Sequence, residues 1–222
     1  MNKPLIIAHR GGAGPFEENT IEALNHAVKK GSRALEIDVR FDHLKKRFYL
    51  EHDFIHSRRK NRQNVMSKVI SALPDDIFFL VELKTLAWLR SFYARSFLKE
   101  YYGLFKPANT VIISFNPFVM AQIRRLAPDL KRGYLMGNIY WRFLFRTIFH
   151  RFIRPEYLLL NKRVFNMRYM KFARKNGYKV FCFVLNDKHS WQKAIDFGID
   201  GIITDKPVEL NAFMKEKGYN PA

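Results

Sequence analysis

The chain contains a single cysteine, Cys182, among its 222 residues, so an internal disulfide bond is excluded. Cys182 lies within the apolar run 180–184, which favours a thiol buried in a hydrophobic core. No segment approaches the roughly 20 consecutive apolar residues that a membrane-spanning helix needs. The first apolar run, residues 5–8, is also too short for a signal peptide. We therefore expect a cytoplasmic protein, with peripheral attachment to a membrane left open.

Acidic residues are scarce relative to basic ones. Against 20 Asp and Glu stand 39 Lys and Arg, which gives a net charge of +19. Such an excess favours anionic partners such as phospholipid surfaces, nucleic acids or phosphorylated substrates. The basic residues are spread along the chain and no nucleic-acid-binding motif is present, so a nucleic-acid-binding protein is only an alternative. The glycines at 11, 12 and 14 lack the spacing of a dinucleotide fingerprint.

Ionisable residues follow several strand-like apolar runs. Residues 5–8 lead into His9 and Arg10, and residues 77–81 lead into Glu82 and Lys84. Within residues 34–39, Glu36 and Asp38 alternate with apolar residues. Because side chains of a strand alternate between its faces, we expect Glu36 and Asp38 on one face, and Glu82 and Lys84 on one face of another strand. A short run at 48–50 leads into His52 and Asp53.

These residue types together indicate one chemistry. Three carboxylates, on Glu36, Asp38 and Glu82, are the oxygen ligands that a hard divalent cation such as Mg²⁺ or Ca²⁺ prefers. His9 and His52 can serve as general acid and general base. Arg10 and Lys84 can bind an anionic substrate. A single His or Glu at a strand end is most often a structural group, so the prediction of metal-assisted phosphodiester cleavage depends on the whole set.

The order of elements predicts a fold. Strand-like and helix-like segments alternate through about eight units over residues 1–222, which is typical of a single-domain (β/α)₈ TIM barrel with its active site at the C-terminal ends of the strands. A doubly wound open sheet is the alternative. Asn19 is expected to cap the first helix, with Glu22 in capping-box position. Asn116 and Pro117 are expected to begin another.

At these residues the sequence resembles the glycerophosphodiester phosphodiesterases, and the resemblance spans nearly the whole chain. It implies hydrolysis of glycerophosphodiesters to glycerol 3-phosphate and an alcohol, with attack either by water or first by the substrate's own neighbouring hydroxyl. The family usually carries a Trp where this chain has Phe183; a Phe can still wall the pocket but lacks the indole N–H. The segment after His52 and Asp53 is also shorter than in many relatives. The matching pieces are His9-Arg10-Gly11, Glu18-Asn19-Thr20, Glu36-Ile37-Asp38, His52-Asp53, Glu82-Leu83-Lys84, residues 183–187 and residues 198–207.

Two further residues are expected near this site. We interpret Glu18 as a group that orients the residues around it rather than as a ligand, and Asp53 as a residue that orients its own loop. A barrel that retains all these polar residues but has lost catalysis is a less favoured interpretation.

A lipid-directed enzyme is the main alternative activity. The spider-toxin-like phospholipase D group resembles the same barrel, metal triad and histidine pair, so a lysophospholipase D or sphingomyelinase D-like enzyme at a membrane surface is also compatible. Residues 140–154 are rich in aromatic and basic residues and predict an amphipathic helix, either packed on the barrel or lying in a membrane interface. Its expected apolar face is Trp141, Leu144, Phe145, Ile148, Phe149 and Phe152; its expected basic face is Arg142, Arg146, His150 and Arg154.

Overall fold

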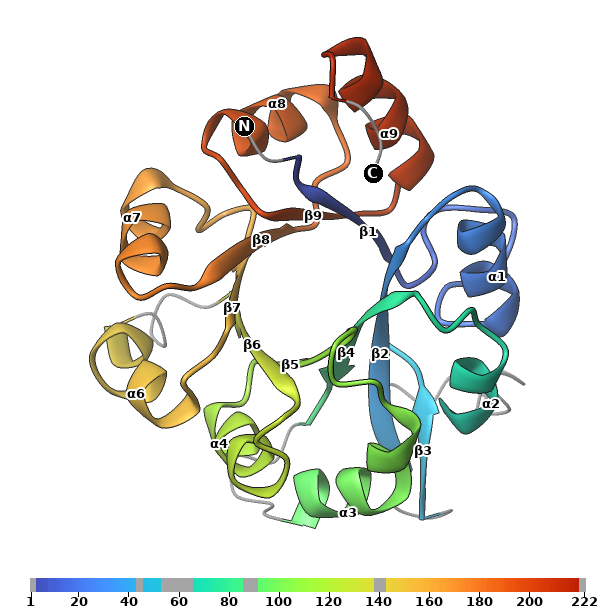
Figure 1. Ribbon diagram of the computed structural model, residues 1–222, viewed down its shortest axis with the longest axis vertical. Coiled ribbons are helices and arrows are strands. Elements are labelled where there is room, and N and C mark those ends of the chain that lie inside the picture. Colours follow the sequence, from blue (N-terminus) through green and yellow to red (C-terminus); the bar gives the residue numbers. More distant parts are fainter. Residues whose placement is uncertain (1–2, 43–45, 53–65, 86–91, 138–142, 220–222) are drawn as a thin grey trace.

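The computed structural model describes residues 3–42, 46–52, 66–85, 92–137 and 143–219. Within these ranges, eight parallel strands form a ring and the helices lie around its outside (Figure 1). The ring strands are β1 (Leu5–His9), β2 (Ala34–Asp42), β4 (Phe78–Leu83), β5 (Thr110–Ser114), β6 (Lys131–Met136), β7 (Tyr157–Asn161), β8 (Lys179–Phe183) and β9 (Gly201–Thr204).

The sheet is closed. β1 pairs in parallel with β9 along its length, from Leu5 beside Gly201 to Ala8 beside Thr204. β1 also pairs with β2, with His9 beside Glu36. Because the first strand contacts both the second and the last, the predicted (β/α)₈ barrel is confirmed and the open-sheet alternative is wrong.

Short polar side chains cap the N-termini of α1 (Ile21–Lys29), α4 (Pro117–Leu126), α7 (Met167–Lys175) and α8 (Lys188–Asp196). Asn116 accepts hydrogen bonds from the Phe118 and Val119 amides and Pro117 follows it, as predicted. The first helix is different: Thr20, not Asn19, caps it, by accepting a hydrogen bond from the Ala23 amide. The other described helices are α2 (Met66–Ser71), α3 (Phe92–Tyr101), α6 (His150–Ile153) and α9 (Pro207–Glu216), with a 3₁₀ segment η1 (Tyr102–Leu104) and a π-helical segment η2 (Phe145–Phe149).

One strand lies outside the ring. β3 (Arg47–Leu50) pairs antiparallel with the end of β2, with Leu50 beside Val39. The sequence suggested that His52 follows a strand of the barrel, but it follows β3, which lies outside the ring. The chain extends beyond the barrel along β2 and returns along β3, and this return brings His52 back to the rim.

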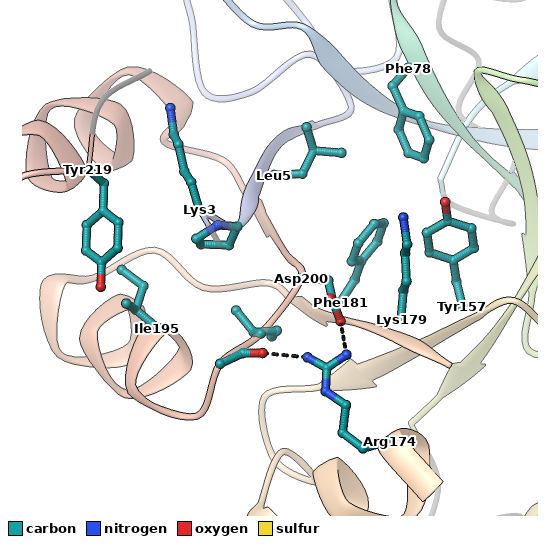
Figure 2. Close-up of a pocket in the computed structure, with 13 residues that line it drawn as sticks. Lys3, Leu5, Phe78, Tyr157, Arg174, Lys179, Phe181, Ile195, Asp200 and Tyr219 are labelled. Atoms are coloured by element: carbon teal, nitrogen blue, oxygen red, sulfur yellow. Dashed lines mark hydrogen bonds and ion pairs between the residues drawn. The ribbon is translucent and has the colours of Figure 1, made fainter. Parts of the chain in front are cut away.

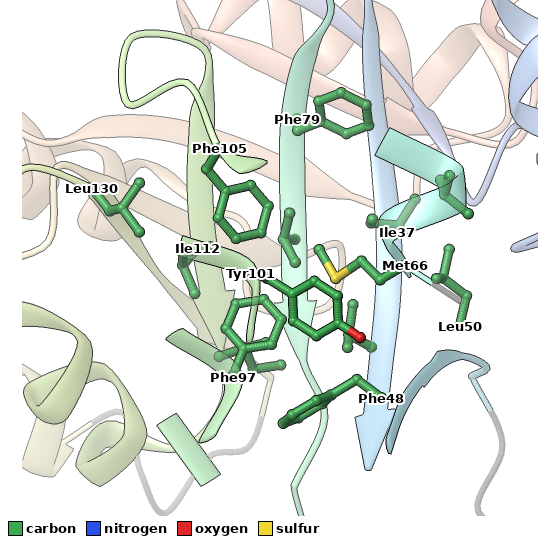
Figure 3. Packing of buried hydrophobic residues seen from close by; sticks show 14 of the residues in the cluster. Ile37, Phe48, Leu50, Met66, Phe79, Phe97, Tyr101, Phe105, Ile112 and Leu130 are labelled. Atoms are coloured by element: carbon green, nitrogen blue, oxygen red, sulfur yellow. The ribbon is translucent and has the colours of Figure 1, made fainter. Parts of the chain in front are cut away.

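The alternation of side chains divides each strand between two cores. On β2, Leu35, Ile37 and Val39 face outward into the cluster under α1 to α3, as expected, while Ala34 faces the barrel interior. Phe48 of β3 completes the outer cluster, with its ring edge-on to those of Phe97 and Tyr101 (Figure 3) and to that of Tyr93. Burial of such aromatic side chains contributes about 1.5–3 kcal/mol each. Cys182 is fully buried, and burial raises the pKa of its thiol to about 12, in agreement with the predicted core thiol.

In the segment predicted to be an amphipathic helix, the buried and exposed side chains differ from those expected. Residues 140–142 lie outside the described part of the chain. Across the π-helical segment, Phe145 faces inward and stacks on Tyr134 with ring centroids 4.4 Å apart. Ile148 and Phe152 were expected to share its face but are exposed, because the wider π turn shifts the register. Arg146 was expected on a solvated face, but its Cζ lies 5.5 Å from the centroid of the Phe172 ring. No helix of the described residues is long and apolar enough to cross a membrane.

Candidate active site

The polar residues predicted on separate strands meet at one end of the barrel. Register places His9 of β1 beside Glu36 of β2, and Asp38 of β2 beside Glu82 of β4. On these strands, the inward-facing residues nearer the N-terminal end are apolar, so the ionisable groups gather at the C-terminal rim. This is the end at which TIM barrels carry their active sites.

Three buried carboxylates form the centre of this cluster. One oxygen each from Glu36, Asp38 and Glu82 lies within 4.8 Å of the others. Burial, together with the charges of Asp38 and Glu82, raises the pKa of Glu36 well above its usual range. Burial and Asp38 likewise raise the pKa of Glu82 to about 7. Burial would also raise the pKa of Asp38, but the charges of Lys84 and Arg10 outweigh it and hold that pKa below its usual value.

Two cations contact the triad. Arg10 Nε lies 2.8 Å from Asp38 Oδ2, and Lys84 Nζ lies 2.8 Å from Glu82 Oε1 and 3.1 Å from Asp38 Oδ1. Buried carboxylates are costly unless cations offset them, and here two cationic side chains contact a group of three carboxyl groups. Carboxylate oxygens are the donors that a hard divalent cation prefers, and such an ion would offset the remaining charge of the ionised triad. The three carboxylates that the sequence predicted as metal ligands therefore fit the group that they were expected to hold.

Arg10 is itself oriented by its neighbours. Its backbone has a left-handed φ of 53°, and its amide donates to the Glu36 carbonyl at 2.9 Å. Its guanidinium donates to Glu18 Oε1 at 2.8 Å. Glu18 thus lies next to Arg10 at the exposed edge of the site, and the described contacts place it on the arginine rather than in the triad.

His9 contacts one residue that the sequence analysis did not assign to the site, Asp205, and Asp205 in turn contacts another, Asn186. Its Nδ1 lies 2.6 Å from Asp205 Oδ1, and its Nε2 lies 3.9 Å from Glu36 Oε2. Asn186 donates to Asp205 Oδ2 at 2.5 Å and accepts from the Asp205 amide. Hydrogen bonding to His9 lowers the pKa of Asp205. Asp205 directly follows β9, the strand beside β1, so closure of the barrel was the signal that could have located it.

Asn19 was also missed as a site residue. Its Nδ2 donates to Asp38 Oδ2 at 3.1 Å, and its Oδ1 accepts from the Asp38 amide at 3.0 Å. Its φ of 59° is left-handed, a conformation that Asn tolerates better than most residues. The side chain that was expected to cap a helix instead fixes a carboxylate of the triad.

His52 lies at the same rim. It is half-buried, and its charge is among the causes that lower the pKa of Asp38. Its carbonyl accepts hydrogen bonds from Nε of Arg40 at 3.0 Å and from Nη2 of the same side chain at 2.5 Å. Asp53, predicted to orient this loop, lies outside the described residues.

An aromatic wall and a small cavity flank the carboxylates. The cavity has a volume of about 170 Å³, and Glu82, Lys84, Ser114 and Phe115 are among its lining residues. Phe183, at the end of β8, is half-buried, and its ring centroid lies 6.1 Å from that of Phe115. Phe183 therefore contacts Phe115, which lines this cavity. The sequence analysis did not assign Phe115 to the site.

The sequence matches the model of the glycerophosphoryl diester phosphodiesterase family over residues 9–41 and 81–209. The chain belongs to this family. A glycerophosphodiester phosphodiesterase from Caldanaerobacter subterraneus subsp. tengcongensis is 27% identical over 249 residues, which cover 97% of this chain and 100% of that protein. The predicted family and enzyme class are therefore confirmed.

Two further relatives are similar over most of their length. The human lysophospholipase D GDPD1 is 25% identical over 271 residues, which cover 94% of this chain and 85% of the human protein. The solved structure of a phosphodiesterase from Oleispira antarctica, in complex with the product sn-glycerol-3-phosphate, superposes with a TM-score of 0.78 at 20% identity. It covers 96% of this chain and 97% of that one, and it supports the barrel fold.

The family match omits residues 42–80, which contain β3, His52 and α2. Glu36, Asp38, Glu82 and Asp205 all lie inside the matched ranges, and so does His9. The role of His52 therefore stays a prediction from the sequence motif, with which its position near Asp38 agrees.

Proposed function

We propose that this chain is a metal-dependent phosphodiesterase that hydrolyses glycerophosphodiesters to glycerol 3-phosphate and an alcohol. The observation that carries this proposal is the buried triad of Glu36, Asp38 and Glu82, with Arg10 and Lys84 beside it at the C-terminal end of the barrel. Family membership supports the same substrate class.

Glu36, Asp38 and Glu82 would hold one divalent cation, Mg²⁺ or Ca²⁺. When bound, such an ion supplies positive charge next to the phosphate oxygens, where negative charge builds up in the transition state. Arg10 and Lys84 already lie at the triad and would bind the remaining oxygens of the phosphodiester. The planar guanidinium of Arg10 matches two oxygens at once, whereas Lys84 acts as a point charge.

His9 and His52 are the proposed acid–base pair. Asp205 accepts a hydrogen bond from His9 Nδ1–H, which leaves Nε2 as the atom that faces the site. One histidine removes a proton from the attacking group, which is either water or the neighbouring hydroxyl of the substrate, and the other protonates the oxygen of the departing alcohol. The P–O bond to the alcohol breaks as the new P–O bond forms. Attack by water gives glycerol 3-phosphate directly, whereas attack by the substrate hydroxyl gives a cyclic phosphate that a water molecule then opens to glycerol 3-phosphate.

The test is turnover of glycerophosphocholine by the purified chain, with a chelator and then with excess Mg²⁺ or Ca²⁺. We expect release of glycerol phosphate that the chelator abolishes and a metal ion restores. His9→Ala and His52→Ala should each lower kcat by about 10²- to 10⁴-fold, the usual contribution of general acid–base catalysis. His189→Ala, on the outer helix α8, is the matched control and should keep wild-type turnover. Full activity in the chelator would refute the proposed metal, and full activity of either site variant would remove that histidine from its role.

A lysophospholipid substrate is the second candidate, and one observation favours it. Phe143 and Phe152 are 72% and 60% exposed, and Ile148 is 45% exposed. Exposed apolar side chains on a strongly basic protein are suited to an anionic lipid surface. The relative named lysophospholipase D is compatible with this substrate.

Vesicle binding tests this second candidate. Charge reversal at Arg146 would also disturb its contact with Phe172, so the apolar side chains make a sharper test. Phe143→Ser with Phe152→Ser should weaken binding to anionic vesicles and lower turnover of lysophosphatidylcholine, while turnover of glycerophosphocholine is kept. Leu104→Ser, 43% exposed on η1, is the control. Equal vesicle binding by the double variant and the wild type would refute the membrane contact.

A further inference from the structure

A second, larger cavity lies at the opposite end of the barrel from the triad. It has a volume of about 560 Å³, within the range of small-molecule sites. It opens at the N-terminal ends of the strands, where Leu5 begins β1, Phe78 begins β4 and Lys179 begins β8 (Figure 2). The active-site residues lie at the other ends of these strands, so neither the proposed chemistry nor its substrate involves this cavity.

Aromatic rings separate the cavity from the active site. The ring centroids of Tyr157 and Phe181 lie 5.1 Å apart, and that of Phe78 lies 6.2 Å and 6.5 Å from them. The barrel is packed tightly here, because a Cβ on Gly201 would come within 2.6 Å of the Phe181 ring. The three rings close the barrel interior and also present an apolar wall to the cavity.

The polar part of the lining is cationic. Lys3, Arg174 and Lys179 line the cavity, against a single carboxylate, that of Asp200, among its described lining residues. Arg174 pairs with Asp200 Oδ2 at 2.8 Å and also donates to the Gly198 carbonyl (Figure 2). The Val180 amide donates to the same carboxylate oxygen at 2.6 Å. Asp200 is therefore already neutralised and hydrogen-bonded.

The two lysines remain available. Among the described residues, neither Lys3 nor Lys179 has a carboxylate within ion-pair distance. Lys179 Nζ lies 5.9 Å from the centroid of the Tyr157 ring, on the aromatic wall. Partial burial, and after it the nearby charge of Lys215, lower the pKa of Lys3.

We propose that this cavity binds an amphiphilic anion, a molecule with one acidic head group and an apolar body of aromatic or acyl character. Lys179, which lies at the aromatic wall, contacts the head group, and the wall contacts the body (Figure 2). The apolar wall excludes a purely polar anion such as free phosphate as the preferred ligand, because it would leave that wall without a partner. The cationic lining likewise disfavours a neutral or cationic ligand of the same shape.

Calorimetric titration with three probes tests the proposal: 2-naphthoate, octanoate and the neutral amide of 2-naphthoate. We expect at least one carboxylate to bind and the amide to bind at least roughly tenfold more weakly, because the amide lacks the charge that strengthens the hydrogen bond to a lysine. Naphthoate against octanoate decides between an aromatic and an acyl ligand, and either supports the proposal. Binding of neither carboxylate, or equal binding of acid and amide, overturns it.

Variants then locate the site. Lys179→Gln should weaken binding roughly tenfold, and Lys175→Gln, nearby on α7 but not a lining residue, should leave it unchanged. Lys84→Met tests the active site as a competing anion site. Loss of binding in Lys84→Met with full binding in Lys179→Gln would overturn the proposal. Thermal melts of each variant verify that the fold is kept, and turnover of glycerophosphocholine by Lys179→Gln should match the wild type.

Discussion

Replacement of Asn19 tests how the triad is held in place. The residue is 3% exposed and makes two hydrogen bonds to Asp38, one to its carboxylate and one from its amide. Asn19→Ala removes both. Arg10 still neutralises the carboxylate oxygen, but the Asp38 amide becomes a buried donor without this acceptor, at a cost of about 1–3 kcal/mol.

The backbone adds a second cost that depends on the replacement. At a φ of 59°, alanine places its Cβ against the following carbonyl, which costs about 1–2 kcal/mol, whereas glycine has no Cβ to clash. We therefore expect Asn19→Ala to lose about 2–5 kcal/mol. Asn19→Gly should lose the hydrogen bonds only, and be the more stable variant by about 1 kcal/mol after its greater freedom in the unfolded chain is counted.

Thermal and urea unfolding of the two variants measure this difference. For a chain of this size 1 kcal/mol corresponds to about 2–4 °C in Tm, so a gap of a few degrees in favour of glycine is expected. In the middle of a helix or strand, glycine would be the less stable replacement. The order of the two Tm values therefore tests the left-handed geometry at residue 19. A Tm of Asn19→Ala equal to or above that of Asn19→Gly would refute this geometry. A wild-type Tm in both variants would refute a contribution of the contacts with Asp38 to stability.

Two other predictions concern catalysis and metal binding. Asp205→Asn should lower kcat by at least about tenfold, by analogy with the carboxylates that orient metal-ligating histidines, with little change in KM because Asp205 contacts His9 rather than the phosphate. Asp187→Asn, at the cap of α8, is the control. An unchanged kcat in Asp205→Asn would contradict the positioning role. The pKa of Glu82 is raised to about 7, so the folded metal-free chain holds this proton more tightly than the unfolded chain does. The stability that this proton contributes is present at acidic pH and is lost as pH rises through 7. Saturating Mg²⁺ or Ca²⁺ should therefore raise Tm more at pH 8 than at pH 6, measured by differential scanning fluorimetry, and an equal or larger gain at pH 6 would contradict it.

Strand alternation explains why so much of the site could be predicted. Glu36 and Asp38 sit two residues apart in an apolar strand, so a period of two alone places them together on the inner face. The same rule places Glu82 with Lys84. Parallel strands then bring these pairs to one end of the barrel, and no knowledge of the loops is needed.

The residues that were missed depend on contacts between segments far apart in the sequence. Asp205 reaches His9 only because the last strand closes against the first. Asn19 is a residue type that often caps helices, and it precedes the helix at a suitable distance. The local sequence does not distinguish it from Thr20, which is the residue that caps the helix. Tertiary contacts with Asp38 decide between them. Likewise, a single π-helical turn at 145–149 reverses the facing that a regular helix predicts for Ile148 and Phe152.

The two ends of the barrel follow from one pattern in the strands. Along β1, β2 and β4, the inward-facing side chains change from apolar at the N-terminal end to ionisable at the C-terminal end, as in Leu5, Ile7 and His9. Carboxylates gather at the C-terminal end, where they need cations, so this end is suited to a metal ion and to a phosphate held by Arg10 and Lys84. At the N-terminal end the aromatic rings close the interior, and among the described residues Lys3 and Lys179 outside them have no carboxylate within ion-pair distance. We therefore infer that one barrel would hold two anion sites of different selectivity, because the triad that would bind a metal ion together with the anion lies at the C-terminal end.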